Sequence, residues 1–232
     1  MFKKYIIWDR EELGITNNTL DNSQIQYRCE RLHNLCNSAT KLYYPIDFKQ
    51  IPENGIYIMF QENEQAHGDE RIVRVGSHTG QNQLQSRIEG HYIKENKNRS
   101  ILRKNIGRCF LKMRNDKYLA IWEQKGSSNK QINYEKELEK EISEYIRSNF
   151  HICIIKTDYK KETRMELESK IIATISLCNS CKPSERWLGL FSPIVKIKDS
   201  GLWQVQWLYK KNLILTDIDL EFIEQNLLFI KE

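Results

Sequence analysis

Long hydrophobic runs are missing from this sequence. It contains no stretch of about 18 consecutive apolar residues, the length that a membrane-spanning helix needs. The apolar residues 5–8 follow Lys3 and Lys4 but end at Asp9, and this run is too short for a secretory signal peptide. We therefore expect a cytoplasmic protein with no membrane partner.

Proline and glycine are also scarce, at four and ten of the 232 residues, and no internal repeat or low-complexity linker interrupts the chain. This length fits one domain with terminal additions. We expect a helical N-terminal arm over residues 1–50, a core over 51–182 and a C-terminal extension over 183–232 that packs on the core. The extension holds Trp187, Trp203 and Trp207, and packing is a commoner use of such rings than stacking on a base.

No second CxxC pair accompanies Cys178 and Cys181, the one such pair among six cysteines. A structural zinc ion takes four ligands, usually from two such pairs or from one pair and two spaced histidines. We therefore expect reduced thiols that serve mostly as small apolar residues, and no zinc site.

Positive charge is concentrated in one segment, although the formal net charge is only +5. Residues 86–108 hold seven cations against Glu89 and Glu95, so this segment alone accounts for the net charge. Such a concentration suits a phosphate backbone, but a charge run is often only a solvated helix face. The seven cations are Arg87, Lys94, Lys97, Arg99, Arg103, Lys104 and Arg108.

The spacing of apolar residues predicts a small sheet. Apolar side chains on alternating faces predict a strand at residues 56–60 and a second at 72–76. The polar segment 61–70 suits a hairpin connection, which makes the two strands antiparallel neighbours. A third strand is predicted at 118–123, and residues 151–156 are also strand-like.

Helical spacing predicts the remaining elements, at residues 27–39, 84–92, 134–149 and 163–177. A further helix start is predicted at Asp9. In the extension, Ser192 and Pro193 suit a helix start and Gly201 suits a helix end. The expected fold class is α/β of the α+β kind: a small, mainly antiparallel three-stranded sheet flanked by helices, with helical additions at both termini.

Arg87 and His91 stand four residues apart, so their side chains project side by side from the predicted helix. Arg87 offers a planar fork for phosphate oxygens, and His91 can exchange a proton near neutral pH. Both could reach one phosphate, although an exposed pair without a function has the same spacing.

Two acids lie on the helix predicted at residues 163–177, and helix geometry separates their roles. Glu166 stands three residues after Thr163, which is the spacing of a capping box. Glu168 shares its helix face with apolar residues, and a buried carboxylate needs an ion partner. We expect Glu168 to bind a metal ion, with a salt bridge to Arg164 as the alternative.

Tyr57 points to the sheet face opposite Ile56 and Ile58, so it need not be a core residue. Its phenol could accept a proton from water, and a packed tyrosine with one hydrogen bond is the alternative.

These residues occur in the order of the motifs of the GIY-YIG nuclease superfamily, which residues 52–179 resemble. The resemblance implies a three-stranded sheet flanked by helices and hydrolysis of nucleic-acid phosphodiester bonds with one Mg²⁺ or Mn²⁺ ion. A free-standing nuclease with extra flanking segments is similar to the GIY-YIG restriction enzymes. The motifs are Gly55-Ile56-Tyr57, then Val75-Gly76, then Arg87 with His91, and finally Glu168.

The resemblance implies a role for each of these residues. Tyr57 is the general base for the attacking water, Arg87 and His91 contact the scissile phosphate, and Glu168 holds the metal. The cations Arg99, Arg103 and Lys104 would hold the DNA backbone.

One position departs from the family pattern, because Arg74 stands where the family has its second tyrosine. From the strand beside Tyr57, its guanidinium would favour the phenolate form, or it would contact a phosphate instead.

The predicted function is therefore a metal-dependent endonuclease acting on DNA, with restriction or defence as one role and a homodimer as one assembly that the sequence allows. One alternative is a catalytically weakened nucleic-acid-binding module, which the departure at Arg74 motivates. The other is a nuclease acting on RNA or on branched or damaged DNA, since nothing in the sequence encodes the shape of a substrate.

Overall fold

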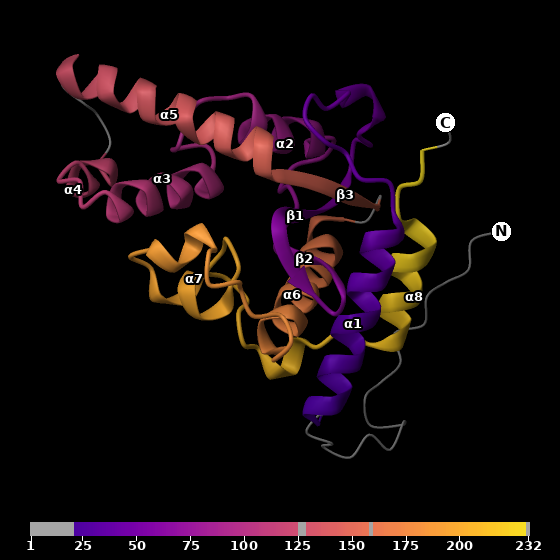
Figure 1. Cartoon of the computed structure of the whole chain (residues 1–232). Coiled ribbons are helices and arrows are strands. Elements are labelled where there is room, and N and C mark those ends of the chain that lie inside the picture. Colours follow the sequence, from indigo (N-terminus) through magenta and orange to yellow (C-terminus); the bar gives the residue numbers. More distant parts are fainter. Residues whose placement is uncertain (1–20, 125–128, 158–159, 231–232) are drawn as a thin grey trace.

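The computed structural model describes residues 21–124, 129–157 and 160–230. A three-stranded antiparallel sheet lies between two layers of helices (Figure 1). The strands are β1 (Gly55–Ala66), β2 (Asp69–Gly76) and β3 (Phe150–Lys156), in the order β2-β1-β3. The predicted fold class is confirmed, and no helix in the described residues is both long enough and apolar enough to cross a membrane.

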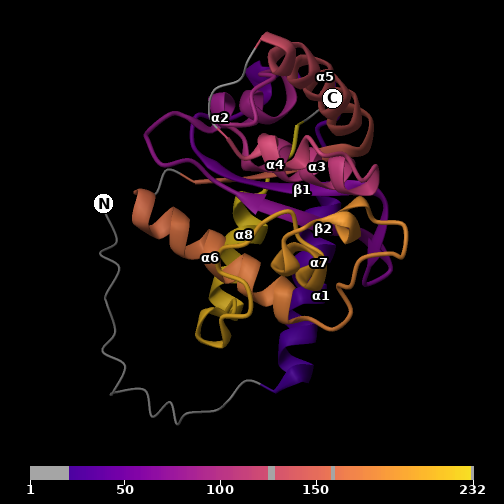
Figure 2. The same ribbon diagram turned by 90° about the vertical axis from the view of Figure 1, so that its left-hand side faces the viewer.

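The helices divide between the two faces of the sheet, as Figure 2 also shows. One layer contains α2 (Leu84–Tyr92), α3 (Ile101–Met113), the short α4 (Leu119–Trp122) and α5 (Asn129–Asn149). The other contains α1 (Asn22–Ser38), α6 (Lys161–Leu177) and α8 (Asp217–Asn226). A helix α7 (Val195–Ser200) and the 3-10 turns Phe48–Gln50, Leu188–Phe191 and Lys211–Leu213 complete the described elements.

The central strand β1 follows the alternation that its sequence predicts. Ile56, Ile58 and Phe60 enter the core on the side of α1 and α6, while Tyr57 and Met59 enter the core on the side of α2 and α3. The strand is buried on both faces, because a helix layer covers each face of the sheet. Tyr57 is therefore a core residue, in contrast to the expectation that it need not be one.

The hairpin between β1 and β2 is tighter than predicted. The predicted strands continue through most of the polar segment, and the turn consists of His67 and Gly68. Both turn residues have positive φ angles, of 57° and 83°, and this suits the right-handed twist of a two-residue hairpin.

The predicted strand at residues 118–123 is wrong, because this segment forms the helix α4. Tyr118 and Trp122 stand one helical turn apart, and the Trp122 indole donates a hydrogen bond to the Lys104 carbonyl at 2.9 Å. A short apolar run has the same composition in a buried helix as in a strand. The third strand is the one that residues 151–156 indicate.

The predicted helices at residues 27–39, 84–92, 134–149 and 163–177 are confirmed as α1, α2, α5 and α6. The helix start predicted at Asp9 lies outside the described residues. Helix α7 begins after Ile194 rather than at Ser192, and Gly201 ends it with a left-handed φ of 69°, as expected for a C-terminal glycine.

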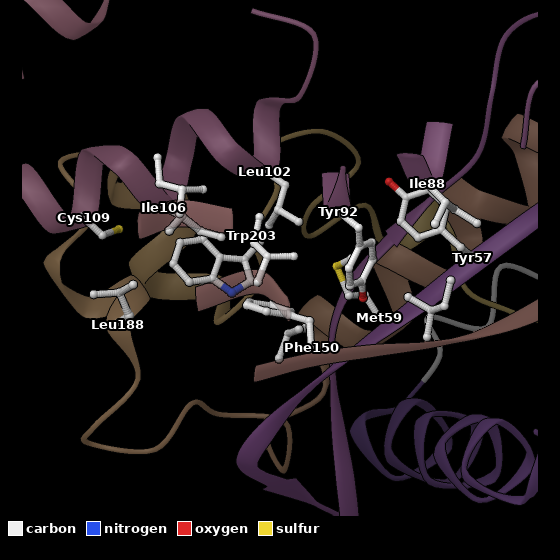
Figure 3. Close-up of a cluster of buried hydrophobic side chains, with 14 of the residues drawn as sticks. Tyr57, Met59, Ile88, Tyr92, Leu102, Ile106, Cys109, Phe150, Leu188 and Trp203 are labelled. Carbon is white, nitrogen blue, oxygen red and sulfur yellow. The ribbon is translucent and has the colours of Figure 1, made fainter. Parts of the chain in front are cut away.

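The segment after α6 packs on the sheet through buried aromatic rings. Trp203 lies between Leu102 of α3 and Phe150 of β3 (Figure 3). The indoles of Trp187 and Trp203 both donate hydrogen bonds to Gln61 Oε1 at 3.0 Å. These two rings are core residues.

Two buried polar contacts hold the same segment to β2. The Trp203 amide donates to the Val73 carbonyl at 2.8 Å, and the Val75 amide donates to Gln204 Oε1 at 3.0 Å. At the other side of the sheet, Leu42 exchanges backbone hydrogen bonds with Ile152 of β3.

Candidate functional site

Tyr57 and His91 form a buried hydrogen-bonded pair beneath the end of β2. The Tyr57 hydroxyl lies 2.8 Å from His91 Nε2, and the Arg74 Nε–H donates to the same hydroxyl at 3.3 Å. Tyr57 lies opposite Gly76 in the strand register. A side chain on Gly76 would lie 2.3 Å from the Tyr57 hydroxyl, so the ring fits there because residue 76 is glycine.

His91 is held from its other nitrogen by the start of the next helix. Its Nδ1 lies 2.7 Å from the Ser100 hydroxyl, and Ser100 also accepts the Arg103 amide as the N-cap of α3. Burial, together with the positive charges of three nearby arginines, lowers the pKa of His91 well below its ordinary value. His91 is therefore neutral at neutral pH, and its Nε2 can accept a hydrogen bond from the Tyr57 hydroxyl when Nδ1 carries the ring hydrogen.

The sequence predicted that His91 projects beside Arg87, where both side chains could reach one phosphate. The structure instead directs His91 into the core. The His91 side chain is fully buried and contacts the equally buried Tyr57, and neither ring lines the cleft. Arg87, one turn earlier on α2, is half-buried and lines the cleft walls.

A cleft of about 360 Å³ lies above the buried pair. Arg74, Gly76 and Ser77 line it from the end of β2, Arg87 from α2 and Glu168 from α6. Residues Gln204–Trp207 supply the opposite wall. A second cleft of about 400 Å³ adjoins it through Ser77 and Arg87, and Lys94 and Arg99 also line that cleft.

Glu168 faces the first cleft from the inner side of α6. Its carboxylate accepts a hydrogen bond from the Ser77 hydroxyl. Burial raises the pKa of Glu168, while Ser77 and the positive charges of Arg74 and Arg87 act in the opposite direction. Arg164 instead donates to the His78 carbonyl at 3.1 Å.

Glu168 offers the kind of oxygen ligand that a hard divalent cation takes. Mg²⁺ binds oxygen ligands and commonly uses one or two carboxylates together with water and substrate phosphate. The half-buried carboxylate opens on a cleft with room for those additional ligands, and the Ser77 hydroxyl lies beside it.

Glu166 does not form the predicted capping box with Thr163. Helix α6 begins at Lys161, so Thr163 lies inside the helix rather than at its start. Glu166 is exposed and pairs with Lys170 at 3.1 Å, one turn along the same face. The two acids therefore point in different directions, as expected, but Glu166 has another structural partner.

The basic segment 86–108 is largely neutralised in the folded chain. The buried Arg103 donates to the Glu139 carboxylate at 2.8 Å and to the His91 carbonyl at 3.0 Å. Lys97 is likewise buried and pairs with Glu135 at 2.6 Å. Arg103 is therefore not available to bind a DNA backbone, and it joins α2 and α3 to α5 instead.

Lys104 also has an acidic partner, Glu123, at 3.0 Å. Arg99 differs from both, because it is exposed and lines the second cleft. Of the three cations predicted to bind the backbone, Arg99 is the one that the fold directs into a cleft beside Arg87.

Sequence reasoning missed Ser77, Ser100 and the cleft wall from the C-terminal segment. Ser77 directly follows Gly76, so its place at the end of the motif strand was a usable signal. No local pattern connects Ser100 to His91 or Trp207 to the cleft, since these contacts depend on how distant segments pack.

The family model described as GIY-YIG domain matches residues 18–220 of the chain. The match includes all of the site residues described above and extends well beyond the motif-bearing residues 52–179 on both sides. No curated protein and no solved structure shows significant similarity to the chain.

Proposed function

Since the chain belongs to the GIY-YIG family, we propose that it is a metal-dependent endonuclease that hydrolyses DNA phosphodiester bonds. Family membership indicates nuclease activity and a nucleic-acid substrate in general. The observation that supports the finer proposal is the Tyr57–His91 hydrogen bond of 2.8 Å beneath a cleft lined by Arg87 and Glu168.

In this mechanism, Tyr57 is the general base. The proton of the attacking water passes to the phenol oxygen as the Tyr57 proton moves to His91 Nε2. This step needs the cleft to open onto the buried Tyr57 hydroxyl, and it needs the bound phosphate to offset the positive charges that keep His91 neutral. The Arg74 Nε–H, which already donates to that oxygen, stabilises negative charge on it during the transfer. His91 positions the Tyr57 hydroxyl and holds its proton, and Ser100 fixes the ring orientation from Nδ1.

Arg87 and Glu168 act on the phosphate side of the cleft. Arg87 presents a guanidinium to the non-bridging phosphate oxygens, where it balances the charge that develops in the transition state. Glu168 would hold one Mg²⁺ or Mn²⁺ ion, with Ser77 orienting its carboxylate. When bound, this ion supplies Lewis-acid stabilisation of the oxygen that leaves.

The cleft wall from the C-terminal segment suits a polynucleotide. Trp207 is 38 % exposed and lines the same cleft as Arg87 and Glu168. An exposed aromatic ring can stack on a base without regard to sequence. Trp207 thus differs from Trp187 and Trp203, which the core buries.

The substrate is tested with purified protein on plasmid DNA, branched DNA and single-stranded RNA, each with Mg²⁺ and with a chelator. We expect cleavage of plasmid DNA that requires the metal. Discrete fragments would support a restriction or defence role, whereas a smear would exclude sequence-specific recognition. Cleavage of RNA or of branched DNA alone would replace the proposed substrate, and binding without cleavage of any of them would identify a binding module.

The position of the DNA backbone is tested by salt dependence. We expect Arg99→Ala to reduce the slope of log affinity against log salt concentration by about one unit, because each phosphate contact releases about one counterion. Binding is measured on the Glu168→Gln background to prevent cleavage. Lys104→Ala is the matched control and should leave the slope unchanged, since Glu123 already pairs with Lys104. Equal slopes for Arg99→Ala and the parent would exclude this path.

A further inference from the structure

Three distant segments bring a second group of ligand-type side chains together, away from the cleft. Cys29 lies on α1, His67 in the hairpin turn between β1 and β2, and Cys178 and Cys181 in the turn that follows α6. Cys29 and Cys181 are 152 residues apart in the chain, yet their sulfur atoms lie 3.3 Å from one another.

The four side chains converge on one point. His67 Nε2 lies 3.4 Å from Cys178 Sγ and 3.3 Å from Cys181 Sγ, and Cys181 Sγ lies 3.3 Å from Cys29 Sγ. A tetrahedral zinc ion with Zn–S bonds of about 2.3 Å and a Zn–N bond of about 2.0 Å separates its ligand atoms by roughly 3.5–3.8 Å. The observed separations are close to those distances.

These contacts do not form a disulfide. All six cysteines are free thiols, and 3.3 Å between Cys29 and Cys181 is far longer than a sulfur–sulfur bond of about 2.05 Å. A buried thiol alone is an ordinary small core residue, but here three of them pack on one imidazole, so four ligand-type atoms lie together.

His33 also lies close to Cys29, His67 and Cys181, with Nδ1 3.7 Å from Cys29 Sγ and Nε2 3.9 Å from Cys181 Sγ, but both of its ring nitrogens have closer partners. Nδ1 donates to the Cys29 carbonyl at 2.9 Å, and Nε2 accepts the Ile72 amide at 3.2 Å. An imidazole with both nitrogens engaged has no lone pair for a metal. The ligand set is therefore Cys29, His67, Cys178 and Cys181.

The hairpin turn places the His67 side chain in this group. His67 has a φ of 57°, a left-handed conformation that His, like Asn and Asp, adopts more readily than most residues. This turn projects the imidazole back onto the CxxC segment. The buried Arg71 lies near Cys181, but it pairs with Glu64 at 2.5 Å, so its charge is shared with that carboxylate.

We propose that Cys29, His67, Cys178 and Cys181 bind one structural Zn²⁺ ion. Soft thiolates select zinc, and four protein ligands leave no open position for substrate. The ion joins α1 and the β1–β2 hairpin to the end of α6, the helix that carries Glu168. It is distinct from the Mg²⁺ or Mn²⁺ expected at the cleft, which an oxygen ligand would hold.

This proposal replaces the sequence-based expectation of no zinc site. That expectation rested on the missing second pair of ligands, and the fold supplies that pair from two segments that are not adjacent in sequence. The CxxC spacing of Cys178 and Cys181 was a usable signal, but Cys29 and His67 follow no zinc-binding spacing.

The first test is the metal content of the full-length protein, purified in reducing buffer without added metal and without chelator. We expect about one zinc per chain by elemental mass spectrometry, unchanged in Glu168→Gln. Replacement by Co²⁺ should give the intense visible bands of a tetrahedral site together with thiolate-to-metal charge-transfer absorption. A protein that contains no zinc and gives no thiolate–cobalt absorption after Co²⁺ addition overturns the proposal.

Zinc binding by single variants distinguishes a residue that binds the ion from one that only packs in the core. His67→Asn keeps a residue that tolerates positive φ, and should weaken zinc binding by at least about tenfold while the secondary structure persists. Cys181→Ser should lose zinc, whereas the matched control Cys109→Ser, at a buried thiol in the opposite core, should retain it even if its thermal stability falls. Zinc retained in His67→Asn with unchanged affinity and cobalt spectrum, or a Cys29–Cys181 disulfide in the native protein, would exclude the site.

Discussion

Glu168→Gln is expected to lose metal-dependent cleavage by at least about a hundredfold while DNA binding persists. The amide keeps the size of the side chain but removes the negative charge that a divalent cation requires. Its oxygen can still accept the Ser77 hydroxyl that now contacts Glu168, so the wall of the cleft should stay intact. Cleavage is measured by nicking of plasmid DNA, and binding by fluorescence anisotropy at the same Mg²⁺ concentration.

Glu166→Gln is the matched control on the same helix. Glu166 is exposed and pairs with Lys170, so its loss should cost only about 0.3–0.5 kcal/mol of unfolding free energy. The rate of cleavage should not change. If both variants lost activity to the same extent, the two acids would not have the separate roles assigned to them.

Tyr57→Phe is expected to reduce the turnover number by about 10²–10⁴-fold, the range for loss of a general base. The ring and its packing remain, but the hydroxyl that contacts His91 Nε2 and Arg74 Nε is removed. The buried partners left behind should cost about 1–3 kcal/mol of unfolding free energy. Single-turnover cleavage, together with urea unfolding, separates the catalytic loss from the loss of stability.

Tyr92→Phe is the control for the removal of a buried hydroxyl. Tyr92 lies on the same helix as His91, and its hydroxyl is buried with no hydrogen-bond partner among the described residues. Removing it leaves no donor or acceptor unpaired, so both stability and turnover should be retained. Full activity in Tyr57→Phe would exclude Tyr57 as the base, and equal losses in both variants would indicate a packing effect.

The sequence predicted those parts of the fold that a local pattern determines. The alternation at Ile56, Ile58 and Phe60 predicts β1, because the side chains of a strand point alternately to two faces. The segment around Trp122 was mispredicted, because its few apolar residues suit a helix and a strand equally. The division of the chain into arm, core and extension stays a prediction.

The candidate site could be predicted only as a set of residue types in order. Motif order selected Tyr57, His91 and Glu168, but it could not show that His91 is buried against Tyr57 rather than exposed beside Arg87. Local charge was misleading at Arg103, since its partner Glu139 follows 36 residues later on a helix that only the fold brings near. Counting cations along a segment therefore overstates the charge that the folded surface presents.

The terminal segments also determine how this small sheet can meet another molecule. A strand at the edge of a sheet presents unpaired backbone groups to which a strand from a second chain can add. Here the outer edge of β2 is hydrogen-bonded to Trp203 and Gln204. The outer edge of β3 is hydrogen-bonded to Leu42 at Ile152 and to Leu228 at Ile154. These contacts hinder edge-to-edge growth of the sheet at Val73–Val75 and at Ile152–Ile154, so we expect any homodimer to use another surface. Removal of residues 183–230 would expose β2 to self-association and would take away the Trp207 side of the cleft.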